Sequence, residues 1–375
     1  MNILYISKID GRPWIGPTYS VPNQVAAQSQ YDNVFWYNIV DSGEDAGKEN
    51  LKIWRELNYY HDLKDFPSQK INDLPGPFNN PDLIIMEQGY PFAKDKIRRE
   101  VFKSEIPYII VPRGELTTTA QKKKKIKKII GNILLDYHRF VKKAVAIQCL
   151  TEQEEIGTKN KWNDVKIILP NGTELHNVKH NYSDKKSLNG VFIGRIETYQ
   201  KGLDILVDAC EIVKKKLKAS KCHIHLYGSD RENKLAPLLE LIEQRDLSDI
   251  ISFHGPVFGK EKAKVLSDAD FFIITSRFEG HPMGLLEALA YGLPSLVTTG
   301  SNMRLEVETN KAGWGADNNA VSVASAFERL VADVDNYQKM SQNAVKLAEQ
   351  YSWDAIAQKS HVNYIELLQK RRREK

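Results

Sequence analysis

The sequence has few cysteines and no long apolar run, and both absences narrow the class of protein. Only three of its 375 residues are cysteines, and none has the Cys-x-x-Cys spacing of a zinc or redox site. We expect free thiols in a reducing compartment rather than a disulfide framework. No apolar run approaches the ~18 residues of a membrane-spanning helix, and no signal-peptide core follows the first residues. These features predict a cytoplasmic protein.

The chain also lacks a strong excess of either charge. It carries 53 Lys and Arg against 48 Asp and Glu, a net charge of +5, which does not indicate a nucleic acid partner. A composition of 42% hydrophobic and 27% charged residues excludes a largely disordered chain. Because 375 residues exceed what one hydrophobic core usually organises, two domains are expected.

Strand-like apolar runs alternate with longer helix-like segments, and this alternation predicts two doubly wound α/β domains with parallel sheets. The runs are "NILYIS", "VFWYNIV", "DLIIM", "PYIIVP", "AVAIQCL" and "VKIILP" in the first half, and "GVFIG", "HIHLYG", "IISFHG", "DFFIITS" and "PSLVTT" in the second. We predict a first domain over residues 1–172, a polar linker over 173–188 and a second domain over 189–350. Residues 351–375 are expected to form a helix that crosses back to the first domain and ends in a basic tail.

The first strand of the second domain is followed by "GRIETYQKG", which offers two cations at the carboxyl end of a strand. Gly194 permits a tight turn, and Arg195 and Lys201 would suit a diphosphate, because Arg can bind oxygens in pairs and Lys acts as a point charge. An ordinary loop with two solvated cations is an equally good interpretation of this spacing.

A second anion site is indicated by "FEGHPMGLLE". Pro282 suits the first position of a helix, since no N–H is missed there. The amides of Met283, Gly284 and Leu285 are then expected to be unpaired donors at the positive end of the helix dipole. Gly284 also leaves room for a phosphate to approach closely.

Two glutamates frame this helix start. Glu279 precedes the helix, and Glu287 lies within it among apolar neighbours. A helix that is apolar all round is buried, so Glu287 is expected to need a partner. Either carboxylate could accept two hydrogen bonds from a sugar diol. The alternatives are a helix-flanking charge for Glu279 and a buried structural pair for Glu287.

With "GRIETYQKG" followed by "SRFEGHPMGLLEALAYGLP", the second domain resembles the retaining glycosyltransferases of family 4. In the first domain, "VPRGEL" and "LPNGTEL" are similar to the same family. The resemblance implies the GT-B fold, in which two Rossmann-like domains face each other across a cleft. It also implies a nucleotide diphosphate sugar as donor. Arg195 and Lys201 would hold the diphosphate, Glu287 the ribose hydroxyls and Glu279 the donor sugar.

The same resemblance supplies the remaining site residues. The nucleobase should lie near "LYGSD" and "FHGPV", with uracil favoured because UDP-sugars are the commonest donors in the family. The expected catalytic residues are Arg195, Lys201 and Glu279. The expected donor-binding residues are Gly194, Arg195, Lys201, Gly228, Gly255, Val257, Glu279, Gly280, His281, Met283, Gly284, Leu285 and Glu287.

The acceptor is expected to bind the first domain. Its candidates are Gly16, in a glycine-containing turn after the first strand, and Arg113, Gly114 and Glu115 in "VPRGEL". Many relatives carry a histidine where this chain has Arg113. The lysine-rich segment from Lys122 to Lys128 is helix-like and basic, so it could meet an anionic membrane surface. A solvated charged face is the alternative.

No metal ion and no other cofactor is expected. Two Asp-x-Asp pairs occur, but one precedes its strand and the other lies in a helix-like segment, whereas metal-dependent transferases place such a pair after a strand. The sequence thus predicts a retaining, metal-independent hexosyl- or N-acetylhexosaminyltransferase. It would move sugar from a nucleotide sugar to a glycan or lipid-linked glycan during synthesis of a bacterial capsule, exopolysaccharide or other surface polysaccharide.

Two alternatives stay open. One is a sugar phosphorylase or nucleotide-sugar hydrolase of the same fold. The other is a non-catalytic binding module that is recruited to a membrane.

Overall fold

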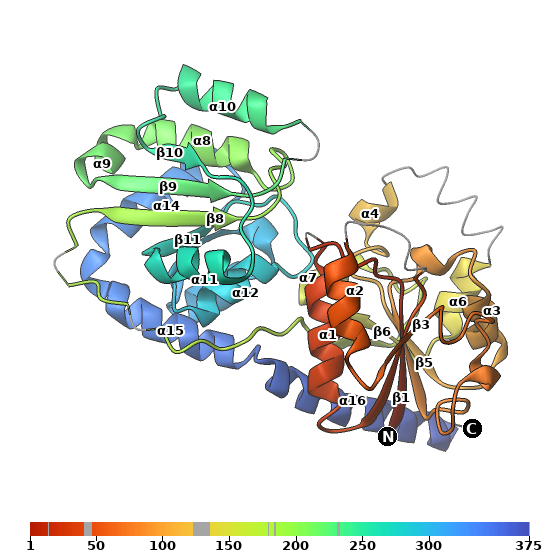
Figure 1. Ribbon diagram of the computed structural model, residues 1–375. Helices are drawn as coiled ribbons and strands as arrows, with labels where there is room; N and C mark the ends of the chain where they lie inside the picture. The colour runs from red at the N-terminus through yellow and green to blue at the C-terminus, as the bar shows by residue number, and fades with distance from the viewer. Residues whose placement is uncertain are drawn as a thin grey trace. The chain divides into compact units, whose positions relative to one another are not determined.

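Two parallel sheets organise the chain, one in each of the two units of this computed structural model (Figure 1). The first unit combines Met1–Gly172 with Trp353–Lys375, and the second is Thr173–Ser352. The structure describes residues 1–13, 15–40, 47–122, 136–178, 180–183, 185–230 and 233–374. Most of the lysine-rich segment lies outside these residues.

The sheet of the first unit has seven strands in the order β3-β2-β1-β4-β5-β6-β7, and the recorded strand pairs are parallel. Its strands are β1 (Asn2–Ser7), β2 (Asn33–Asn38), β3 (Tyr60–Asp62), β4 (Leu83–Glu87), β5 (Tyr108–Val111), β6 (Ala146–Cys149) and β7 (Lys166–Ile168). Its helices are α1 (Pro17–Gln28), α2 (Lys48–Arg55), α3 (Lys96–Lys103), α4 (Thr118–Lys122), α6 (Tyr137–Lys143) and α7 (Glu152–Gly157).

Both faces of this sheet are buried, which explains why its strands read as continuous apolar runs. Successive side chains of a strand point to opposite faces. Ile3 and Tyr5 of β1 therefore pack with α1 and α2, whereas Leu4 and Ile6 pack with α3 and α6.

The last helix, α16 (Trp353–Glu374), belongs to the first unit, as predicted for the chain's final segment. It packs against α1, so a red helix near the start of the chain and the blue helix at its end are in contact in Figure 1. Tyr364 is fully buried there, and its hydroxyl donates to Gln148 Oε1 at 2.8 Å. His361 Nδ1 lies 2.9 Å from an Asp32 carboxylate oxygen and adds a polar contact to the same junction.

The second unit has six strands in the order β10-β9-β8-β11-β12-β13, again parallel. They are β8 (Leu188–Ile193), β9 (Cys222–Tyr227), β10 (Ile251–Phe253), β11 (Phe271–Ile274), β12 (Ser295–Thr298) and β13 (Gly313–Ala316). The helices are α8 (Leu203–Ile212), α9 (Lys214–Ala219), α10 (Leu235–Gln244), α11 (Gly259–Asp268), α12 (Met283–Ala290), α13 (Arg304–Thr309), α14 (Ala320–Ala332) and α15 (Tyr337–Glu349). The prediction of two Rossmann-like α/β domains is confirmed.

The segment 173–188, predicted to be a polar linker, belongs to the second unit and packs against it. Tyr182 within it is only 5% exposed, packs against Tyr337 and donates a hydrogen bond to the Asp270 carbonyl at 3.1 Å. His180 Nε2 lies 2.8 Å from the Tyr291 carbonyl oxygen. Two aromatic residues in an otherwise polar stretch are enough to attach it to the second unit's core.

Among the residues that the structure describes, no helix combines the length and the apolar character that crossing a membrane requires. Cys149, Cys210 and Cys222 are buried free thiols, as predicted. Burial raises the pKa of Cys149 and of Cys222 to about 12, so both remain protonated at neutral pH.

Candidate functional site

The residues predicted to hold the diphosphate and the donor sugar lie at the point where the strand order of the second sheet reverses. The chain builds β8, β9 and β10 outward on one side, then returns to place β11 against β8. In open parallel sheets, ligands bind beyond the carboxyl ends of the strands at such a point. The loop after β8 carries Arg195 and Lys201, and the loop after β11 carries Glu279, Gly280 and His281.

Glycines let these loops approach closely. Gly202 has a positive φ of 62°, and a Cβ there would lie 2.0 Å from the Thr275 carbonyl oxygen. Thr275 Oγ1 in turn donates to the Gly202 carbonyl at 2.9 Å. A Cβ on Gly228 would lie 1.8 Å from the Gly194 carbonyl oxygen. The ends of β8, β9 and β11 can therefore meet only because these positions carry no side chain.

The structure brings Lys201 and Glu279 into direct contact. Lys201 Nζ lies 2.6 Å from Glu279 Oε1, and the two side chains are 15% and 10% exposed. Ser276 Oγ donates to the same oxygen at 2.5 Å. Arg195 is exposed, and among the described residues its guanidinium makes one long 3.4 Å contact, with Gln200 Oε1. Of the two predicted diphosphate cations, Lys201 is held in place and Arg195 reaches into solvent.

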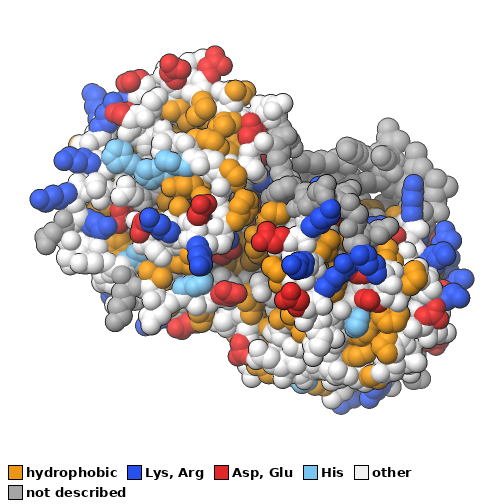
Figure 2. Space-filling model, in the orientation of Figure 1, with side chains coloured by type: hydrophobic (Ala, Val, Ile, Leu, Met, Phe, Trp, Pro, Cys, Tyr) orange, Lys and Arg blue, Asp and Glu red, His pale blue; other side chains and the backbone are white. Residues whose placement is uncertain are grey.

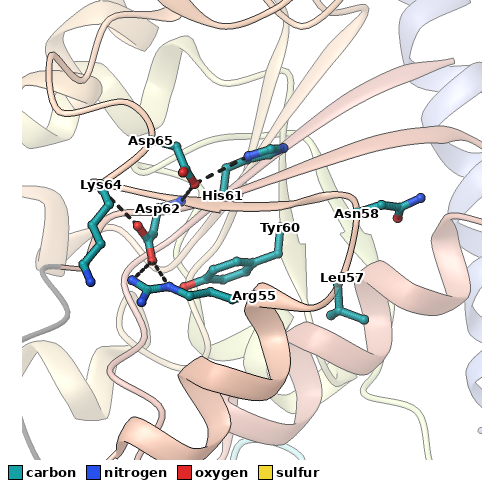
Figure 3. A pocket seen from close by; sticks show the side chains of 8 residues that line it. All are labelled: Arg55, Leu57, Asn58, Tyr60, His61, Asp62, Lys64 and Asp65. Atoms are coloured by element: carbon teal, nitrogen blue, oxygen red, sulfur yellow. Dashed lines mark hydrogen bonds and ion pairs between the residues drawn. The ribbon is translucent and has the colours of Figure 1, made fainter.

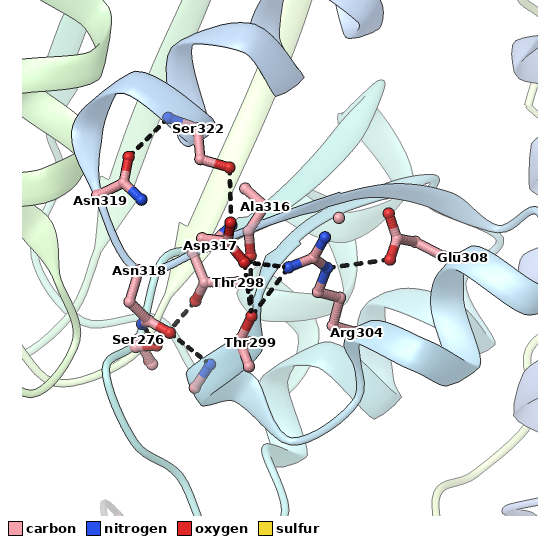
Figure 4. Close-up of polar contacts among 12 residues, drawn as sticks. Ser276, Thr298, Thr299, Arg304, Glu308, Ala316, Asp317, Asn318, Asn319 and Ser322 are labelled. Carbon is pink, nitrogen blue, oxygen red and sulfur yellow. Dashed lines mark hydrogen bonds and ion pairs between the residues drawn. The ribbon is translucent and has the colours of Figure 1, made fainter.

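Two asparagines from later loops also bind the loop after β11. Asn302 Nδ2 donates to the carbonyl oxygens of Glu279 at 2.6 Å and of Gly280 at 3.2 Å. Figure 4 shows Asn318 bound to Ser276, with Nδ2 2.7 Å from the Ser276 carbonyl oxygen. The backbone around Glu279 is therefore fixed by side chains that the sequence analysis did not single out.

Helix α12 starts one residue later than expected. Pro282 is its N-cap in extended conformation, and Met283 is the first helical residue. The amide of Leu285, predicted to be unpaired, donates to the Pro282 carbonyl at 3.0 Å. Within the described part of the chain, the Met283 and Gly284 amides donate to no carbonyl, so the predicted anion site would have two free amide donors rather than three.

Glu287 is not buried as its apolar neighbours in the sequence suggested. Its side chain is 22% exposed and forms an ion pair with Lys262, whose Nζ lies 2.8 Å from Glu287 Oε1. Lys262 lies on α11 and was missed by sequence reasoning, since nothing in a lysine-rich helix start singles out one lysine. The second glutamate of the site thus also faces a lysine.

The expected nucleobase region lies at the ends of β9 and β10. The Gly228 amide donates to the Gly255 carbonyl at 2.8 Å, and the half-buried Val257 follows. The His254 ring stacks on Tyr227, with centroids 4.9 Å apart. A short network of side chains continues from His254 along the surface.

In this network, His225 Nδ1 lies 3.0 Å from both His254 Nε2 and Ser252 Oγ. Figure 2 shows histidines grouped on the surface of the part that Figure 1 draws in green and blue. Over the described ranges, no three His, Cys, Asp or Glu side chains form a group that could hold a metal ion.

In the first unit, the predicted acceptor residues already have partners within the unit. Arg113 Nε lies 2.9 Å from Glu87 Oε2, and its Nη1 donates to Asn171 Oδ1 at 3.0 Å. The Arg113 and Glu87 side chains are 7% and 1% exposed. Burial raises the pKa of Glu87, and Arg113 opposes that rise. The structure shows no side chain of this pair extended toward solvent.

The other acceptor candidates are backbone or capping positions. The Gly114 amide donates to a Glu154 carboxylate oxygen. Glu115 Oε2 accepts from the amides of Gly89 at 3.0 Å and Tyr90 at 3.3 Å. Gly16 is the N-cap of α1, and a Cβ there would meet no atom within 4 Å.

A pocket of about 430 Å³ in the first unit lies apart from all of these residues (Figure 3). Asp62 in its wall binds Arg55, with Arg55 Nε 2.9 Å from Asp62 Oδ2. His61 Nδ1 lies 3.6 Å from Asp65 Oδ2. Arg55 and Asp62 thus pair with each other within the wall of the pocket.

Comparison with known proteins supports the interpretation of the second unit. Residues 188–333 match the family model described as "Glycosyl transferases group 1". The chain is similar to WcaL of Salmonella typhimurium, which is named for colanic acid biosynthesis, with 31% identity over 170 residues. This alignment covers 42% of the present chain and 40% of WcaL.

The amylovoran biosynthesis glycosyltransferase AmsK of Erwinia amylovora is 33% identical over 140 residues, which cover 36% of this chain and 33% of AmsK. The chain thus spans less than half the length of these relatives. Among solved structures, HepE of Anabaena, determined in complex with UDP, superposes with a TM-score of 0.76. The match covers 98% of this chain and all of HepE at 14% identity, and it shows a shared fold.

His281 generates a pH-dependent prediction. It is 8% exposed, and burial lowers its pKa from 6.5 to about 3. The pKa of His281 is lower in the folded protein than in the unfolded chain, so acid protonates the unfolded chain first. The contribution of neutral His281 to folding stability is therefore fully present above pH 6.5 and is lost as the pH falls toward 3. Between about pH 7.5 and about pH 5, this term should lower the free energy of unfolding by about 2 kcal/mol.

Urea unfolding of the wild type and of His281→Asn at both pH values measures this contribution to the free energy of unfolding. The loss of stability on acidification should be smaller in the variant by that amount. An equal loss in both proteins would show that His281 is not the responsible group.

Proposed function

We propose that the protein is a retaining, metal-independent glycosyltransferase that uses a nucleotide diphosphate sugar. One observation carries the proposal: Lys201, Glu279 and the start of α12 converge where the strand order reverses, inside the segment that matches a glycosyltransferase family model. A lysine and two free helix amides suit a diphosphate, and a carboxylate beside them suits sugar hydroxyls.

In this mechanism, diphosphate departs from the anomeric carbon while the acceptor hydroxyl enters on the same face. Negative charge grows on the leaving phosphate, and Arg195, Lys201 and the amides of Met283 and Gly284 stabilise it. The departing phosphate accepts the proton of the acceptor hydroxyl. Since the positive groups belong to the protein, no metal ion is needed for this role.

Donor binding would exchange the partners of the two ion pairs. Phosphate oxygens would replace Glu279 beside Lys201. Hydroxyls of the donor sugar would then donate hydrogen bonds to the Glu279 carboxylate. The ribose diol would bind Glu287, displacing or sharing Lys262. Lys201, Glu279 and Glu287 would then each have a partner both before and after binding, which avoids the cost of an unpaired charge in these three groups.

A surface polysaccharide is the proposed product class. WcaL and AmsK are named for colanic acid and amylovoran biosynthesis, and their similarity to this chain supports the proposal. UDP-sugars are the proposed donors and glycans or lipid-linked glycans the acceptors. The proposed place of action is the cytoplasm, with the acceptor at the inner face of the membrane.

The diphosphate site can be tested first. Arg195→Ala and Lys201→Ala should each lower kcat/KM by roughly tenfold or more, because a charged hydrogen bond contributes about 1.5–3 kcal/mol. EDTA should leave transfer by the wild type intact. Initial rates with a panel of UDP-sugars measure both effects. Normal rates in both variants would exclude the phosphate site, and loss of activity in EDTA with recovery on adding Mn²⁺ would exclude the metal-free mechanism.

Variants of the two glutamates should differ in which step they impair, binding of UDP or transfer of the sugar. Glu287→Gln is expected to weaken binding of UDP, because it would lose the charge that holds the ribose diol. Glu279→Gln should spare UDP binding but impair transfer of the sugar. Calorimetric titration with UDP and rate measurements distinguish the variants, and Lys262→Met controls for loss of the ion pair alone. Equal losses of UDP affinity in both glutamate variants would contradict the assigned roles.

Membrane contact is proposed from the lysine-rich segment alone, which lies mostly outside the described residues. Six lysines at roughly 1 kcal/mol each near an anionic bilayer could supply several kcal/mol of attraction. Replacing Lys122, Lys123, Lys124 and Lys125 with Gln should abolish co-sedimentation with anionic liposomes and leave transfer to a water-soluble acceptor nearly unchanged. Failure of the wild type to co-sediment at low salt would favour a soluble acceptor.

A further inference from the structure

The donor charges of the second unit lie on two separate loops, so something must fix one loop relative to the other. Arg277 follows β11 by three residues, and Asp204 lies in the first turn of α8. Arg277 Nη1 and Nη2 lie 2.7 Å from Asp204 Oδ1 and Oδ2 respectively. This geometry is bidentate, which fixes orientation as well as distance.

The same arginine engages the loop after β8 at two further points. Its Nη1 also donates to the Tyr199 carbonyl at 2.8 Å, and its backbone amide donates to the Gln200 carbonyl at 2.8 Å. The guanidinium lies 4.5 Å from the centroid of the Tyr199 ring, whose side chain is 65% exposed. Arg277 thus binds residues on both sides of Lys201 in the sequence.

These contacts bear on the Lys201–Glu279 pair because of chain geometry. Lys201 lies between Tyr199 and Asp204, and Glu279 follows Arg277 by only two residues. A shift of Arg277 away from Asp204 would therefore move the two charged groups relative to each other. The Arg277 and Asp204 side chains are 24% and 32% exposed, so their pair is not part of the hydrophobic core.

We propose that Arg277 and Asp204 are positioning residues of the donor site: their ion pair, together with the Tyr199 contact, holds the loop of Lys201 against the loop of Glu279. This inference rests on the proposed function, because it assigns the pair to sugar transfer. Neither side chain needs to touch the donor. Their effect is to keep Lys201 and Glu279 at the separation that the transition state requires.

Three variants test this proposal. Arg277→Gln and Asp204→Asn each remove the ion pair, and Arg277→Lys keeps the charge but cannot bind both carboxylate oxygens at once. The matched control is Arg245→Gln, which removes an arginine pair with Glu211 (2.7 Å) at the other end of α8. Transfer from a UDP-sugar is measured for all four proteins and for the double variant Arg277→Gln/Asp204→Asn.

We expect kcat to fall about ten- to hundredfold in the two variants that remove the pair, as for a small misplacement of catalytic groups. The KM for the donor should change less than about threefold, because α12, Arg195 and Glu287 still bind its ground state. The double variant should fall no further than either single one, since both remove the same interaction. Arg277→Lys should be intermediate, and the control should match the wild type.

Hydrogen exchange of the unliganded proteins provides a readout that does not depend on activity. In Arg277→Gln and Asp204→Asn, the segments 198–204 and 276–281 should exchange faster than in the wild type, while the Tm stays close to it. Unchanged exchange in both segments would overturn the proposal, and so would faster exchange without a fall in kcat. If the wild type itself transfers no sugar, the proposed function fails and the positioning role falls with it, yet the exchange data still decide whether the ion pair joins the loops.

Discussion

The close contact between Gly202 and the end of β11 is the constraint on which the candidate site depends. A side chain at position 202 would collide with the Thr275 carbonyl oxygen, and the residue adopts a left-handed backbone conformation that glycine tolerates best. With that contact in place, Lys201 Nζ lies 2.6 Å from Glu279 Oε1, although the two residues are 78 positions apart in the sequence. The reversal of strand order supplies the space beyond the sheet, and the glycine lets one loop reach the other across it.

The electrostatics of the unliganded site follow from the same proximity. Each glutamate of the site contacts a lysine, Glu279 with Lys201 and Glu287 with Lys262. Ion pairs that are mostly withdrawn from water are costly to break unless both partners find replacements. A ligand that carries both phosphates and hydroxyls could replace both partners of the Lys201–Glu279 pair at once, whereas inorganic phosphate would satisfy Lys201 and leave Glu279 unpaired. The arrangement therefore supports the proposal that the donor is a sugar-containing diphosphate.

Strand positions were predictable where burial on both faces demands continuous apolar residues. The two strands that were missed, β3 and β13, are short edge strands with the sequences "YHD" and "GWGA", which carry no such run. That Lys201 and Glu279 lie close together could be predicted, because the carboxyl ends of parallel strands lie at the same edge of a sheet. The Lys262 partner was not, since the choice among several lysines on α11 depends on tertiary packing. Glu287 was misjudged because sequence neighbours in a helix point in all directions, so they do not report which side is covered.

The two units differ in how readily their charged groups could exchange partners. In the first unit, Glu87 is 1% exposed, and its Oε1 has no hydrogen-bond partner in the described structure. If Arg113 turned away to bind a ligand, that buried carboxylate would lose its main partner, a change that typically costs about 3–5 kcal/mol. Arg113 is therefore better suited to shaping the loop after β5 than to holding an acceptor. The proposed acceptor contact at "VPRGEL" would then involve the space beside Gly114, where a Cβ would meet no atom within 4 Å.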